Sequence, residues 1–117
     1  PDRRAQKRRE KILRMKIIEI SFDDILFDKT AASDVLDNAC KRGGWTVSSV
    51  CELSDSIAVI LTKSGNGDAR LVFAKFARSS DDDIIAEIGD RYNSGFDLIG
   101  TFFISDSPWA LYRRASS

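Results

Sequence analysis

The longest run of carboxylates in this 117-residue sequence is Asp81-Asp82-Asp83. Carboxylates can hold Mg²⁺ together with an outside phosphate. Successive residues of a helix point in different directions, however, and the dipole at a helix N-terminus favours negative side chains. We therefore expect these aspartates to begin a helix, and we predict no metal site.

Histidine is absent from the chain, and the two cysteines are Cys40 and Cys51. The chain thus lacks the commonest general base and the commonest zinc ligand. The cysteine spacing fits no metal or redox motif, so we expect two buried thiols in the cytoplasm or another reducing compartment. Ser54-Asp55-Ser56 and Gly65–Asp68 are interpreted as a turn and a hairpin loop. We predict no catalytic residues and no cofactor, which argues against an enzyme without excluding one.

Positive charge is concentrated at the N-terminus. Residues 1–16 contain eight Lys or Arg and two acidic residues, a net charge of +6, and the rest of the chain has a net charge of −6. Such asymmetry indicates an interaction tail. We interpret residues 1–15 as a basic helix or arm that contacts RNA or another anionic partner, with a merely solubilising tail as the alternative. The contacting residues would be Arg3, Arg4, Lys7, Arg8, Arg9, Lys11 and Arg14.

Hydrophobic periodicity predicts a single α+β domain over residues 16–117. Alternation of apolar and polar residues indicates strands, and spacing of three to four indicates helices. Ser33 or Thr30 would cap the first helix, and Ser79 or Ser80 the second. No apolar run approaches the roughly 20 residues that span a bilayer. The expected strands are residues 16–22, 45–53, 57–63, 70–77, 96–104 and 109–114, and the expected helices are residues 34–42 and 81–93.

Two stretches of the chain repeat at an offset of 51 residues. Gly44 aligns with Gly95 and Trp45 with Phe96, and both stretches continue into a Ser-Asp-Ser turn. This pattern predicts a tandem βαββ–βαββ fold with half-repeats 16–64 and 69–115. Because one three-stranded unit with one helix buries little area, we expect a shared, mostly antiparallel sheet of six strands. A pseudo-twofold would relate the halves and place both helices on one face.

The repeated hairpins resemble small uncharacterised bacterial βαββ domains with the signature G-W-E-L-V-S-V, which closes near Y-F-K-R. The match covers a short segment of each copy and departs at the Glu position, which is Thr46 or Asp97 here. The resemblance implies a fold and no chemistry. The residues that carry it are Gly44, Trp45, Val47 and Val50 in the first copy, and Gly95, Phe96, Leu98, Tyr112, Arg113 and Arg114 in the second.

Phe103 and Trp109 fall out of phase with their core-facing neighbours. We expect both to point outward, as a candidate interface with a partner or a second copy. The favoured function is a non-catalytic binding module, an accessory or structural component of a larger assembly with a protein partner, RNA, or both. No membrane partner is expected.

Two other functions stay open. The first is a small-molecule-binding or enzymatic domain with a pocket between the half-repeats. The second is a dimeric adaptor or chaperone-like protein that holds a partner segment on its sheet. The groups available to the pocket would be Glu52, Asp97, Lys75 and Tyr112.

Overall fold

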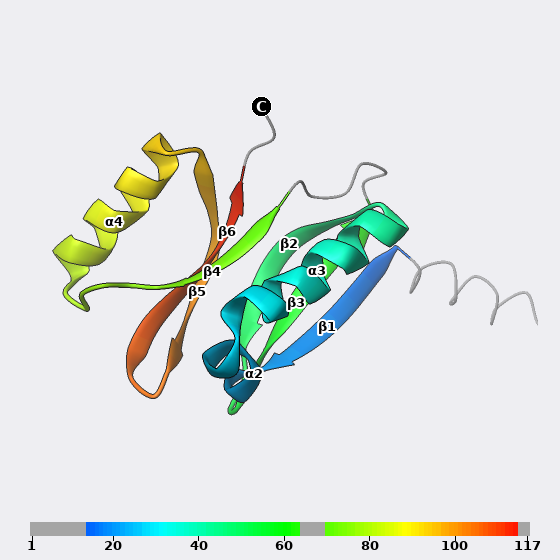
Figure 1. The fold of residues 1–117 in the computed structure, drawn as a ribbon, viewed down its shortest axis with the longest axis horizontal. Helices are drawn as coiled ribbons and strands as arrows, with labels where there is room; N and C mark the ends of the chain where they lie inside the picture. Colours follow the sequence, from blue (N-terminus) through cyan, green and yellow to red (C-terminus); the bar gives the residue numbers. More distant parts are fainter. Residues whose placement is uncertain (1–13, 64–69, 115–117) are drawn as a thin grey trace, which may run out of the picture.

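The computed structural model describes residues 14–63 and 70–114, which form an α+β fold of two three-stranded antiparallel sheets and three helices (Figure 1). Sheet A has the strand order β1-β3-β2 and sheet B the order β4-β6-β5. No helix in these two ranges is long and apolar enough to cross a membrane. The elements are β1 (Met15–Ser21), α2 (Phe22–Phe27), α3 (Lys29–Gly43), β2 (Trp45–Glu52), β3 (Ser56–Lys63), β4 (Leu71–Lys75), α4 (Asp81–Asn93), β5 (Phe96–Ile104) and β6 (Ser107–Arg114).

Side-chain caps determine where the helices begin. The Asp28 carboxylate accepts hydrogen bonds from the N–H groups of Thr30 (3.1 Å) and Ala31 (3.0 Å), so α3 starts at Lys29. The predicted start after Ser33 or Thr30 was therefore too late. Ser21 accepts from the Asp24 N–H and caps α2, a segment predicted to be a connection. Such caps satisfy backbone donors that the first turn of a helix leaves unpaired.

A two-residue turn joins β5 to β6. Ser105 and Asp106 both have positive φ, 48° and 67°. Turns of this kind match the right-handed twist of a hairpin. Consequently β6 begins at Ser107, ahead of the predicted start at Trp109.

The two hairpins pair in the same register at an offset of 51 residues. Trp45 lies opposite Lys63, and Phe96 lies opposite Arg114. Each hairpin also contains a register shift, between Val47 and Ser49 in the first and between Leu98 and Gly100 in the second.

The prediction of one six-stranded sheet is wrong. The edge strands β2 and β5 lie side by side without a backbone ladder between them. Side chains join the sheets instead: Glu52 accepts from the Phe103 N–H, and Arg113 donates to the Val47 carbonyl. A register shift bends a strand and interrupts regular pairing. Both edges contain such a shift, and they pack against each other as separate sheets.

Sheet B is covered on both faces. One face, with Phe73 and Leu111, contributes to the main core, which sheet A and α3 share. The other face, with Ala110 and Tyr112, packs under α4 (Figure 1). The two long helices therefore lie on opposite sides of sheet B, and the prediction that both cover one face is wrong.

Trp109 is buried, with 6% of its surface exposed, so the expectation that it points outward is also wrong. It lies on β6, the central strand of sheet B, where neither face meets solvent. On such a strand, alternation distinguishes two buried faces rather than an inside and an outside. Phe103, on the edge strand β5, is 54% exposed as expected.

Candidate functional site

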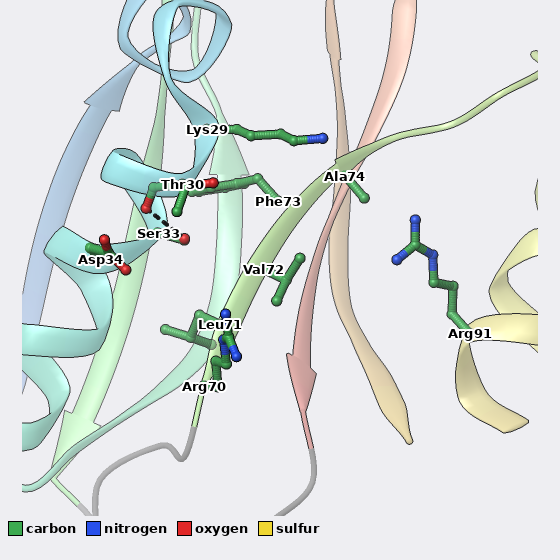
Figure 2. A pocket seen from close by; sticks show the side chains of 10 residues that line it. All are labelled: Lys29, Thr30, Ser33, Asp34, Arg70, Leu71, Val72, Phe73, Ala74 and Arg91. Carbon is green, nitrogen blue, oxygen red and sulfur yellow. Dashed lines mark hydrogen bonds between the residues drawn. The ribbon is translucent and has the colours of Figure 1, made fainter. Parts of the chain in front are cut away.

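A groove lies where the first half of the chain meets the second. Its cavity of about 150 Å³ is bounded by the first turns of α3, by the edge strand β4 and by one residue of α4 (Figure 2). We call it the inter-half groove. The residues that line it are Lys29, Thr30, Ser33, Asp34, Arg70, Leu71, Val72, Phe73, Ala74 and Arg91.

The inter-half groove is lined by more positive than negative charge. Three cationic side chains, Lys29, Arg70 and Arg91, line it together with one carboxylate, Asp34. In Figure 2 the Lys29 ammonium and the Arg91 guanidinium extend toward β4 from α3 and α4 respectively. Arginine and lysine make their strongest hydrogen bonds to carboxylates and phosphates. The groove can therefore hold an anionic group between its walls.

A hydrogen bond fixes α3 against β4. The Asp37 carboxylate accepts from the Leu71 N–H at 2.8 Å. Burial raises the pKa of Asp37, and the bond from Leu71 opposes that shift by favouring the charged form. Nearby, the Ser33 hydroxyl donates to the Thr30 carbonyl at 2.9 Å. The wall formed by α3 is thus attached to the floor formed by β4.

The floor of the groove is the free edge of sheet B. The Arg114 N–H donates to the Arg70 carbonyl, and the Phe76 N–H donates to the Pro108 carbonyl. Hydrogen-bonded residues alternate along an antiparallel ladder. The backbone groups of Phe73 therefore point away from β6, toward the free edge of the strand.

Arg91 is supported from beneath by an aromatic ring. Its guanidinium lies 5.4 Å from the centre of the Tyr112 ring. Tyr112 is fully buried, and its hydroxyl has no hydrogen-bond partner among the described residues. Burial raises the pKa of Tyr112; the positive charge of Arg91 lowers it and Glu87 raises it further. Stacking on the ring restricts the positions that the guanidinium adopts.

The predicted basic arm falls mostly outside the described residues. Only Arg14 lies within them, and its carbonyl accepts from the Lys63 N–H at 3.1 Å, which extends the pairing of β1 with β3. The predicted arm residues outside the described ranges are Arg3, Arg4, Lys7, Arg8, Arg9 and Lys11.

The four groups expected in a pocket between the halves do not come together in this groove. Glu52 is engaged by the Phe103 N–H, and Tyr112 is buried under α4. Asp97 lies on β5, opposite Arg113 of β6, and Lys75 is exposed at the end of β4. The cavity is between the halves, as that alternative requires, but other residues line it.

The remaining candidate groups have structural positions. Ser80 accepts from the Asp83 N–H at 3.2 Å, so Asp81-Asp82-Asp83 begins α4 as predicted. Cys40 is buried as expected, whereas Cys51 is exposed on sheet A, which corrects that prediction. Within residues 14–63 and 70–114, no three His, Cys, Asp or Glu side chains gather as metal ligands would.

Comparison of the chain with protein-family models, with curated proteins and with solved structures finds no match in any of the three. Function therefore has to be argued from the groove itself.

Proposed function

We propose that the protein is a non-catalytic binding module, and that its inter-half groove holds an acidic, extended segment of a protein partner. The observation that carries the proposal is the convergence of Lys29, Arg70 and Arg91 on the free edge of β4. Carboxylates of the segment would bind these cations, and its backbone would pair with the outward backbone groups of Phe73, because the outward N–H of Leu71 is already bonded to Asp37.

The size of the groove favours part of a chain over a whole small molecule. Pockets for drug-sized ligands commonly enclose about 300–1,000 Å³. The inter-half groove encloses about 150 Å³, which suits one acidic side chain. An edge strand, in turn, offers backbone hydrogen bonds that an extended polypeptide can complete.

The test uses a labelled peptide of alternating Glu and Val, with the Gln-Val peptide as its uncharged analogue. Fluorescence anisotropy should show the acidic peptide binding and the analogue binding at least about tenfold more weakly, equivalent to about 1.4 kcal/mol. Lys29→Gln and Arg91→Gln should each weaken binding of the acidic peptide by about the same factor. Arg78→Gln is the matched control, because Arg78 is exposed and does not line this groove.

Equal binding of the two peptides, or no effect of the groove variants, would exclude the proposal. A single-stranded RNA is the third probe. If RNA binds more tightly than the acidic peptide, and the groove variants weaken that binding, the ligand of the groove is a nucleic acid rather than an acidic protein segment.

The basic arm is proposed as a separate RNA contact. If it is one, deletion of residues 1–13 should lower RNA affinity at low salt and leave peptide binding unchanged.

We also infer that the fold is a tandem repeat of two βαββ units. The shared register supports this, and so do two matched contacts, Lys63 over the Trp45 ring and Arg114 over the Phe96 ring. The resemblance to small bacterial βαββ domains stays a prediction of the same kind. If the units are equivalent, the glycines that end their helices should be equally sensitive to substitution.

A further inference from the structure

A second groove lies along the side of α3 that faces away from the inter-half groove. Its cavity encloses about 410 Å³ between the second half of α3 and the first residues of β1 and β2. In Figure 1 the end of α3 lies beside the start of β1. We call this cavity the basic groove, and it shares no lining residue with the inter-half groove. The residues that line it are Lys16, Val35, Asn38, Ala39, Arg42, Gly43 and Trp45.

The basic groove brings together cations from three elements. Lys16 of β1 and Arg42 of α3 line it directly, and both are exposed. The Lys63 ammonium of β3 lies 4.7 Å from the centre of the Trp45 ring, which forms part of the wall. None of the residues that line the groove is acidic. The walls therefore present positive charge without a carboxylate among them.

The strand cations all lie on the face of sheet A that α3 covers. Lys16 is paired with Leu61, which is fully buried in the main core, and paired residues share a face. Lys63 follows Leu61 by two residues on β3, so alternation places it on the same face. The Arg14 carbonyl accepts from the Lys63 N–H, which places Arg14 opposite Lys63. Arg14, Lys16 and Lys63 therefore share the face from which Arg42 approaches.

The stability of α3 accounts for one of these cations. A basic side chain in the last turn of a helix interacts favourably with the helix dipole, which explains Arg42. Lys16 and Lys63 belong to strands, where that explanation does not apply. A cleft lined by charge of one sign concentrates ions of the opposite sign. The arrangement therefore favours an anionic ligand.

We propose that the basic groove holds the phosphodiester backbone of a nucleic-acid strand. Residues 1–13 contain six Lys or Arg, and they join the described fold at Arg14, on the face that contains the groove. A nucleic-acid strand carries one phosphate charge per nucleotide, so it supplies an anion to each cation of a long row. Pockets that enclose whole ligands commonly measure about 300–1,000 Å³. The basic groove falls in this range and can take one nucleotide unit.

This inference extends the proposed RNA contact of the basic arm onto the folded part of the chain. The probe is a labelled single-stranded oligouridylate, and fluorescence anisotropy measures its binding to the full chain. Lys16→Gln and Arg42→Gln should each weaken binding, and the double variant should weaken it at least about tenfold at low salt. Each lost phosphate contact should also lower the slope of log K against log salt by about 0.7. Lys16→Arg keeps the charge and should keep the affinity.

The matched controls are Lys75→Gln, Arg78→Gln and their double variant. Both residues are exposed and lie outside the basic groove, so the controls remove the same charge from another place. They should leave RNA affinity and the salt slope close to those of the wild type. Equal losses in the groove and control variants would mean attraction by net charge alone, and would overturn the proposal.

Two further comparisons separate this proposal from its neighbours. If deletion of residues 1–13 lowers RNA affinity and the Lys16 and Arg42 variants do not, the arm alone contacts RNA and the basic groove is excluded. If those variants lower it and the deletion does not, the groove is supported and the arm contact is excluded. Polyglutamate is the competitor: displacement of RNA at equal charge concentration would show that the groove takes any polyanion, and would overturn the assignment to nucleic acid.

Discussion

Two buried polar atoms lack hydrogen-bond partners among the described residues, the Tyr112 hydroxyl and the Trp109 indole nitrogen. Both belong to β6, the strand that is covered on both sides. A buried polar group without a partner costs roughly 1–3 kcal/mol. The aromatic rings contribute enough buried apolar area to offset that cost. The aromatic rings of Trp109 and Tyr112 thus stabilise β6, whereas the unpaired polar atoms of the same side chains destabilise it.

Tyr112→Phe should therefore stabilise the protein. The substitution removes the unpaired hydroxyl and keeps the ring under Arg91, so the free energy of unfolding should rise by about 1 kcal/mol. Tyr92→Phe is the control, because Tyr92 is 67% exposed and its hydroxyl is free to reach solvent. Urea denaturation measures both variants. A loss of stability in Tyr112→Phe above that of the control would mean that the hydroxyl is bonded.

Secondary structure was largely predictable because, along most of the chain, the hydrophobic periodicity agrees with the capping and turn residues that mark the ends of elements. β5 was predicted with its observed ends, and α4 follows its serine cap. The errors occur where a single polar side chain decides the outcome. Asp28 starts α3 five residues before the predicted Asp34, and Ser21 creates a helix in a segment too short to show a period.

The glycines at the helix ends provide an element-scale prediction. Gly44 and Gly95 have φ values of 65° and 94°, a region that other residues enter at a cost. Gly44→Ala and Gly95→Ala should each destabilise by about 1 kcal/mol, and by similar amounts if the two βαββ units are equivalent. Thermal denaturation measures the change. If the stability lost in the two variants differs severalfold, the two units are not equivalent.

Gly89→Ala is the matched control for these substitutions. Gly89 lies on the exposed side of α4, and a Cβ there would meet no atom within 4 Å. Alanine is the better helix former by about 1 kcal/mol, so this variant should be more stable than the wild type. The effect of a Gly→Ala substitution on stability thus changes sign with the backbone conformation of the glycine.

The assembly of the whole molecule was the least predictable level. Patterning showed six strands, but alternation along β2 and β5 does not say whether the two strands join in one ladder, and the register shift in each has no clear sequence signal. The inter-half groove was missed for a related reason. Lys29, Arg70 and Arg91 are isolated cations in separate parts of the chain, and only the packing of α3 and α4 around β4 brings them together.

The shared core predicts that both halves unfold as one unit. Trp45 belongs to the first half and Trp109 to the second, and both lie in the same buried cluster with Phe102. Removing either half would expose the apolar face that the other half covers, so a state with one half folded is disfavoured. Trp109→Phe leaves Trp45 as the fluorescent reporter of the first half, and Trp45→Phe leaves Trp109 as that of the second. In each variant the fluorescence transition in urea should coincide with the far-UV circular dichroism transition, which follows all helices and strands together. Transitions that separate in either variant would show that the halves are independent and that the main core does not couple them.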